Sequence, residues 1–184
     1  MRALVVYESM YGNTHLVAEA IGRGLRSHAE TSVVPVDGAD PEAIAAADLV
    51  VVGGPTHGHA MSRESTRKAA VDAAEKPDTV LHLDADAEGE GLREWFDSLG
   101  TAGDGVPAAA FDTRFDMPAA ITGRASRGIS KRLRRHGFVE VVAPQSFFVQ
   151  KGNTLESGEE ERAASWGAAL GAQVAVVPAE PTPG

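Results

Sequence analysis

One short loop holds the side chains best suited to binding an anion. Ser9, Gly12, Asn13 and Thr14 fall within the stretch Glu8–Thr14, which follows an apolar run and precedes a helical pattern. A loop of small hydroxyl and amide residues at a helix N-terminus presents backbone N–H groups and a positive dipole end to a phosphate, without needing lysine. An ordinary turn between a strand and a helix needs only one capping side chain. Four such residues together favour a phosphate site.

Other common sites are disfavoured by the sequence. Neither a Walker A motif nor G-x-G-x-x-G occurs, and the absence of cysteine excludes disulfides, thiol nucleophiles and cysteine-ligated metals. His57 and His59 could form a metal pair, but no third ligand has a suitable spacing. The segment 84–90 resembles the start of a calcium loop, yet Trp95 stands where a glutamate is required. We therefore expect no metal, and a solvated acidic loop at 84–90.

Strands and helices alternate along the whole chain. Short apolar runs predict strands, and apolar residues at helical spacing predict helices between them. Asp40 and Pro41 indicate a helix start, Gly137 indicates a helix end, and Ser157 and Glu160 have the spacing of a capping box. The predicted strands are 3–7, 32–36, 49–52, 106–111 and 138–143, the last extended through 147–149 after a kink at Pro144. The predicted helices are 14–27, 41–47, 62–74, 92–99 and 119–136, and a final helix that opens at the capping box 157–160 and runs to about 172.

This alternation predicts a doubly wound α/β fold, because parallel neighbouring strands need crossover helices. With 184 residues, we expect a single domain over residues 1–177, followed by a Pro-rich disordered tail at 178–184. Trp95 and Trp166 lie in helical patterns and are expected in the core. Ligands of such sheets bind beyond the carboxyl ends of the strands. The loops 8–13, 53–61 and 112–118 are therefore the candidate site.

Charge limits the possible partners. The net charge of −9 argues against nucleic acid or an anionic membrane as the main partner. No acid occurs between Met117 and Val139, where six bases gather; we interpret these as a solvated helix face rather than a docking patch. Apolar runs are too short for a membrane span, and the first residues lack the long apolar region of a signal peptide. We expect a cytoplasmic protein without membrane insertion.

The first loop, S-M-Y-G-N-T, resembles the phosphate loop of the flavodoxin family, commonly written [S/T]-x-[S/T]-G-N-T. Tyr11 stands where simple flavodoxins carry a hydroxyl residue, and this form looks like that of flavodoxin domains in flavodiiron proteins and of quinone-reductase relatives. The resemblance implies a flavodoxin-like five-stranded parallel sheet of order 2-1-3-4-5. It also implies FMN as the cofactor, its phosphate held by Ser9, Met10, Tyr11, Gly12, Asn13 and Thr14.

The same resemblance assigns roles to the second and third loops. In the second loop it implies that Pro55, Thr56, His57 and Gly58 contact the flavin, with His57 at the position of the usual stacking aromatic. Gly58 would provide the peptide that can turn toward flavin N5. In the third loop it implies that the backbone of Asp112, Thr113 and Arg114 meets the pyrimidine edge and that Phe115 stacks on the ring. Simple packing of Phe115 beneath the loop is the alternative.

Three functions remain open at this stage. The leading hypothesis is an FMN-binding electron carrier that needs no catalytic residue and exchanges electrons with redox partner proteins or a quinone-like small molecule. The second is an FMN-dependent NAD(P)H:quinone reductase. The third is a flavodoxin-fold interaction module without flavin, because the second loop lacks the usual aromatic residue and the third carries Phe115 in place of tyrosine.

Overall fold

A five-position parallel sheet forms the centre of the protein. The computed structural model describes residues 1–100 and 103–176, so the predicted tail lies outside the described residues. The strand order is β2-β1-β3-β5-β6, and β7 also pairs with β5. Since β6 and β7 together fill one edge position, the order corresponds to the expected 2-1-3-4-5. The strands are β1 (Arg2–Tyr7), β2 (Glu30–Pro35), β3 (Leu49–His57), β5 (Pro107–Phe115), β6 (Val139–Glu140) and β7 (Gln145–Val149).

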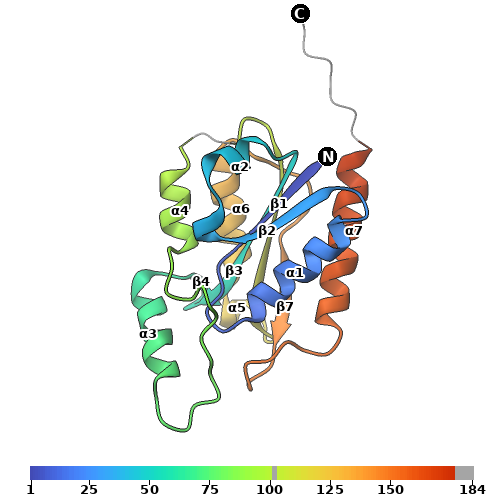
Figure 1. Ribbon diagram of the computed structural model, residues 1–184. Coiled ribbons are helices and arrows are strands. Elements are labelled where there is room, and N and C mark those ends of the chain that lie inside the picture. The colour runs from blue at the N-terminus through green and yellow to red at the C-terminus, as the bar shows by residue number, and fades with distance from the viewer. Residues whose placement is uncertain (101–102, 177–184) are drawn as a thin grey trace, which may run out of the picture.

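Helices cover both faces of this sheet (Figure 1). On one face, α1 and α7 pack over one apolar cluster, which includes Phe111 and Phe147. On the other face, α2, α4 and α6 cover a second cluster, which includes Phe96 and Trp95. Trp95 is buried as expected, and Trp166 packs partly buried against the first cluster. The helices are α1 (Asn13–Leu25), α2 (Pro41–Ala45), α4 (Leu92–Ser98), α6 (Ala125–Arg135) and α7 (Glu159–Ala175).

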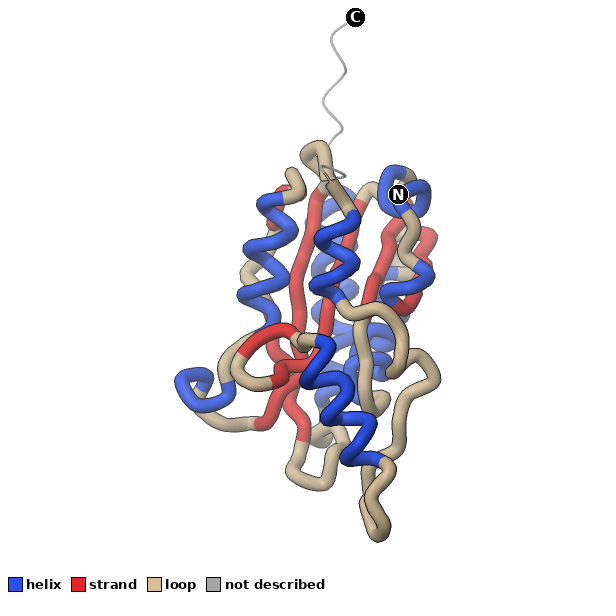
Figure 2. The backbone as a smooth tube through the Cα atoms, turned by 90° about the vertical axis from the view of Figure 1, so that its left-hand side faces the viewer, coloured by secondary structure: helices blue, strands red, loops and turns tan. Residues whose placement is uncertain are grey.

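The carboxyl ends of the strands carry the remaining elements. The two-residue strand β4 (Ala60–Met61) turns back antiparallel to β3, and α3 (Glu64–Ala74) follows it. Figure 2 shows α3 and the long irregular segment after it projecting below the sheet. The turn η1 (Val36–Gly38) follows β2 at the same end. Among the described residues, no helix has the length and apolar character to cross a membrane.

The predicted helix over 119–136 is wrong in one respect, because it is two helices. The short α5 (Ala119–Thr122) and α6 are separated at Gly123, whose φ is 74°. A Cβ at Gly123 would lie 2.0 Å from the carbonyl oxygen of His59. Because the connection between β3 and β4 lies this close to Gly123, the predicted helix is interrupted there.

The predicted capping box at the last helix is also wrong. The N-cap of α7 is Gly158, with φ 84°, and no side chain caps it. Glu159 instead turns its carboxylate back to accept the N–H of Phe148 at 2.6 Å, and Arg162 donates to the same carboxylate. The first turn of α7 is therefore fixed to β7 rather than to its own cap.

Candidate functional site

The phosphate-type loop folds around two internal constraints. Gly12 adopts φ 88° and is the N-cap of α1. Ser9 is buried, and its Oγ accepts the Gly12 N–H at 3.1 Å. Ser9 therefore shapes the loop from inside and does not line the cavity described below.

The N-terminus of α1 has free backbone donors. No side chain caps this helix. Leu16 N–H donates to the Gly12 carbonyl, whereas the N–H groups of Asn13, Thr14 and His15 donate to no group in the part of the chain that the structure describes. Unpaired N–H groups in a first helical turn, at the positive dipole end, form an anion site.

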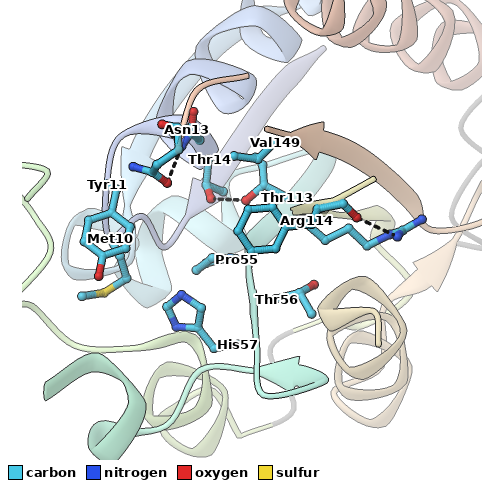
Figure 3. A pocket seen from close by; sticks show the side chains of 12 residues that line it. Met10, Tyr11, Asn13, Thr14, Pro55, Thr56, His57, Thr113, Arg114 and Val149 are labelled. Carbon is cyan, nitrogen blue, oxygen red and sulfur yellow. Dashed lines mark hydrogen bonds between the residues drawn. The ribbon is translucent and has the colours of Figure 1, made fainter. Parts of the chain in front are cut away.

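Two side chains of the first turn tie this helix end to distant loops. Thr14 and Thr113 share a buried hydrogen bond of 2.7 Å between their Oγ1 atoms (Figure 3). The Asn13 side-chain amide donates to both the backbone oxygen and Oδ1 of Asn153, each at 3.1 Å. The ends of β5 and β7 thereby meet the start of α1.

The second candidate segment is a hairpin rather than a loop. β3 continues to His57, and Thr56 and His57 pair with Met61 and Ala60. Gly58 and His59 both have positive φ, 54° and 73°, as the two central residues of a type I′ turn require. The expected irregular loop at 53–61 is wrong because β4 pairs with the end of β3.

His57 lines the cavity from this hairpin (Figure 3). Its Nδ1 is buried and has no hydrogen-bond partner among the described residues. Burial lowers the pKa of the His57 imidazole below its ordinary value, so the ring is neutral at neutral pH. It therefore offers a flat, uncharged face to a ligand.

The third candidate segment is also largely strand, since β5 runs on to Phe115. Asp112 is fully buried, and its Oδ2 accepts the N–H of Ser126 at the start of α6 at 2.7 Å. The Arg114 side chain points away from the cavity (Figure 3). Its Nη1 donates to the carbonyls of Phe115 and Met117 and to Thr122 Oγ1. Both side chains thus have supporting roles.

These three segments line one cavity of about 170 Å³. Ten of the fourteen candidate residues line it, whereas Ser9, Gly12, Gly58 and Asp112 do not. Two lining residues, Val149 and Asn153, were missed by the sequence analysis. The Lys-Gly-Asn-Thr turn at 151–154 follows the last strand at the same sheet edge and was the available signal. The ten predicted residues that do line the cavity are Met10, Tyr11, Asn13, Thr14, Pro55, Thr56, His57, Thr113, Arg114 and Phe115.

The cavity contains no acidic side chain among the described residues, although the chain has a net charge of −9. Among the described lining residues, Arg114 alone carries a permanent charge, and its side chain points away from the cavity. Burial raises the pKa of the Tyr11 phenol, whose Oη donates to the Ala70 carbonyl of α3 at 2.9 Å. An anion placed at the α1 N-terminus would meet no repulsive carboxylate in this cavity.

The acidic segment 84–90 is not simply solvated, which corrects the expectation for Asp84. Its N–H donates to the Met10 carbonyl at 2.9 Å, and its carboxylate lies 3.3 Å from His15 Nδ1. His15 in turn stacks on Tyr7, with ring centroids 4.5 Å apart. This segment therefore supports the first loop from outside. The described residues hold no cluster of three or more metal-ligating side chains.

A fold with this strand order, a phosphate-type loop after β1 and a cavity at the carboxyl ends is flavodoxin-like. The family model for flavodoxin matches residues 5–79, and the resemblance to the flavodoxin family is confirmed. Proteins of the flavodoxin family bind FMN. No curated protein gives a significant match to the chain.

Solved structures agree on the fold. An archaeal flavodoxin superposes with a TM-score of 0.66 at 20% identity, covering 95% of this chain and 99% of that chain. Flavodoxin 1 from Bacillus cereus gives 0.64 at 18% identity, covering 92% and 97%. The flavodiiron protein from Giardia intestinalis gives 0.61 at 23% identity, covering 94% of this chain but 36% of its own. At these identities, the similarity shows the fold.

Proposed function

We propose that the chain binds FMN in the 170 Å³ cavity and functions as an electron-transfer flavoprotein. The observation that carries this proposal is the N-terminus of α1. Three N–H groups without partners in the described chain lie at the edge of a cavity free of acids, in a protein of net charge −9. This combination favours a ligand with a phosphate group.

The residues present fit FMN in two parts. The amides of the 9–14 loop and the Thr14 hydroxyl would hold the phosphate. Pro55–Gly58 on one side, and Thr113 and Phe115 on the other, would hold the ring system. Phe115 is 48% exposed, and the cavity is smaller than the roughly 300–1,000 Å³ of typical ligand pockets. Part of the ring would therefore remain accessible to a partner.

FMN supplies one- and two-electron redox chemistry when bound. The chain itself supplies orientation and a neutral, acid-free surrounding, with His57 unprotonated. Among the described residues, no carboxylate lines the cavity to act as a general acid or base. This favours a carrier that passes electrons to a partner. A reductase is the second candidate, because a second hollow adjoins the cavity at Phe115 and Val149.

Titration of the apoprotein with FMN and riboflavin tests the proposal. FMN should bind at one site and riboflavin much more weakly, because riboflavin lacks the phosphate. Thr14→Ala should weaken FMN binding by about 10- to 100-fold, since a hydrogen bond to a charged group contributes roughly 1.5–3 kcal/mol. Thr31→Ala, on the edge strand β2, is the matched control and should bind as wild type does.

Two results would overturn the proposal. One is equal affinity for riboflavin and FMN, which would place no binding energy at the α1 N-terminus. The other is no flavin binding at all, as expected of an interaction module. A carrier and a reductase then differ in one assay: a reductase alone consumes NAD(P)H when a quinone is present, whereas a carrier needs a separate reductase.

A further inference from the structure

The chain has two asparagines, and they contact each other across the fold. Each lies in a Gly-Asn-Thr sequence, one at residues 12–14 in the first loop and the other at residues 152–154 after β7. The side-chain amide of Asn13 donates to the backbone oxygen and to Oδ1 of Asn153, each at 3.1 Å. Because an amide nitrogen carries two hydrogens, this asparagine pair uses both donors of the Asn13 side chain.

The turn that carries Asn153 has a defined shape. Val149 and Leu155 form an antiparallel bridge, and between them the Gln150 N–H donates to the Thr154 carbonyl at 2.8 Å. The Asn153 N–H donates back to the Gln150 carbonyl at 2.9 Å. Asn153 has a φ of 59°, a left-handed conformation that asparagine adopts more readily than most residues. The backbone of the turn therefore holds both oxygens of Asn153 in fixed positions.

Two contacts flank the free N–H groups at the start of α1. One is the asparagine pair, which joins Asn13 to the turn after β7. The other is the buried 2.7 Å hydrogen bond between Thr14 and Thr113 of β5. In Figure 3, Asn13 and Thr14 lie at one end of the cavity and His57 lies at the other. A flavin with its ring near His57 and its phosphate at α1 would thus end at the asparagine pair.

Mononucleotide and dinucleotide flavins differ at this end of the ligand. The phosphate of FMN is terminal, whereas in FAD it is bonded to a second phosphate that carries adenosine. This extra group would have to pass the turn at 150–154, and the contact between Asn13 and Asn153 closes that path. Separating the pair would break two hydrogen bonds and leave the Asn153 oxygens, which are acceptors, beside a second anionic group. FMN requires no such opening.

We propose that the asparagine pair makes this site selective for a mononucleotide flavin and against a dinucleotide flavin, with Asn153 as the positioning residue. The proposal rests on the proposed function, because it concerns a flavin in the same cavity. Asn13 has two roles in this arrangement. Its backbone N–H is free for the phosphate, and its side chain holds the turn closed.

Parallel titrations of the apoprotein with FMN and FAD measure this selectivity. The dissociation constant of FAD should exceed that of FMN by about 10- to 100-fold, because opening the pair removes two hydrogen bonds of modest net strength. Asn153→Gly removes one acceptor and tolerates the positive φ, whereas Asn13→Ala removes both bonds. Asn153→Gly should lower the ratio of the two dissociation constants by about threefold or more, and Asn13→Ala should lower it further.

The ratio separates selectivity from a general structural effect, because a loosened site would weaken both flavins alike. Thr154→Ala is the matched control, since it changes an exposed side chain in the same turn. It should leave both dissociation constants within about twofold of wild type.

NMR of isotope-labelled asparagine shows the pair directly. The chain gives only two asparagine side-chain amide signals, and Asn153→Gly leaves the signal of Asn13 alone. In the wild type, the Asn13 amide hydrogens should exchange slowly with solvent, and they should stay slow when FMN saturates the protein. At saturating FAD they should exchange faster, because the pair has to open.

Three outcomes would overturn the inference. Wild type binds FAD as tightly as FMN, both variants of the pair keep the wild-type ratio, or FMN itself releases the Asn13 amide hydrogens. In each of these cases FMN still binds, so the proposed function stands. If neither flavin binds, the proposed function and the selectivity fail together.

Discussion

At the scale of single residues, buried carboxylates at strand ends support helices instead of binding ligand. Asp112 accepts an N–H at the start of α6, and Glu8 accepts the Leu92 N–H at the start of α4 at 2.9 Å. Each provides a carboxyl oxygen as the acceptor for an N–H group in the first turn of a helix. Neither acid lines the proposed flavin cavity, although Asp112 lies on β5 and Glu8 directly follows β1.

Glu8 gives a prediction for pH dependence. Burial raises the pKa of its carboxyl, so the folded protein holds this proton more tightly than the unfolded chain does. Stability should therefore fall as the pH rises above the ordinary glutamate range, because the unfolded chain releases its proton first. Glu8→Gln keeps an acceptor for Leu92 and removes the charge. Its unfolding free energy should match wild type near about pH 4 and exceed it at about pH 8.

Urea unfolding of both proteins across this range measures the difference. Glu75→Gln, on the exposed end of α3, is the control and should stay within about 0.5 kcal/mol of wild type. A Glu8→Gln protein that is less stable by the same amount at every pH would show that the carboxylate is stabilising in its charged form.

At the scale of elements, close backbone approaches fix the site walls. The contact between Gly123 and His59 joins the α5–α6 break to the β3–β4 hairpin, and Thr56 Oγ1 accepts the Ala125 N–H just beyond it at 3.0 Å. On the opposite face, a Cβ at Gly24 would lie 2.0 Å from the Ala164 carbonyl oxygen. Glycine is thus required where α1 meets α7 and where the cavity wall meets the hairpin.

Gly123→Ala should therefore be destabilising. The added Cβ would meet a backbone oxygen at 2.0 Å, and the φ of 74° strains any L-residue. We expect the free energy of unfolding to fall by about 2 kcal/mol or more. We also expect weaker FMN binding, because the β3–β4 hairpin would shift. Gly152→Ala is the control, since its Cβ would meet nothing within 4 Å. Thermal unfolding and FMN titration measure both effects; equal behaviour of the two variants would contradict the proposed role of Gly123.

At the scale of the whole molecule, the basic stretch at 124–135 forms part of the surface, and the buried apolar residues form one cluster on each face of the sheet. Within the basic stretch at 124–135, Arg132 pairs with Asp97 and Arg134 pairs with Glu140, while Ile129 and Leu133 are buried. This agrees with a solvated helix face.

The cores on the two sheet faces share the central strands β1, β3 and β5.

Because these strands are shared, the two faces should unfold together as one domain. Phe96→Leu weakens packing on one face and Phe147→Leu weakens it on the other. Each should lower the free energy of unfolding by about 1–2 kcal/mol. Trp95 and Trp166 report on different faces. Each substitution is made in two backgrounds: Trp166→Phe leaves Trp95 as the only tryptophan, and Trp95→Phe leaves Trp166. Unfolding followed by tryptophan fluorescence should give the same midpoint in both backgrounds. A midpoint that shifts for one tryptophan alone would show that the faces unfold separately.

The sequence by itself determined the fold and predicted the sheet edge at which a site would lie. Strand and helix patterns are local, repeat along the chain and need no long-range contact, so the alternation from β1 to α7 could be predicted. The rule that parallel strands end at one edge then predicted that the loops 8–13, 53–61 and 112–118 lie together. The small residues of the first loop indicated a candidate anion site, because capping alone does not need them all.

Only the tertiary structure decided which side chains face the cavity. Asp112 and Arg114 lie on the same strand as Thr113, yet contacts with Ser126 and Thr122 keep their polar groups in supporting roles. The helix break at Gly123, against His59, and the Asn153 contact with Asn13 each depend on residues far apart in the chain. Such contacts carry no local periodicity, because they arise only when the sheet brings distant loops to the same edge.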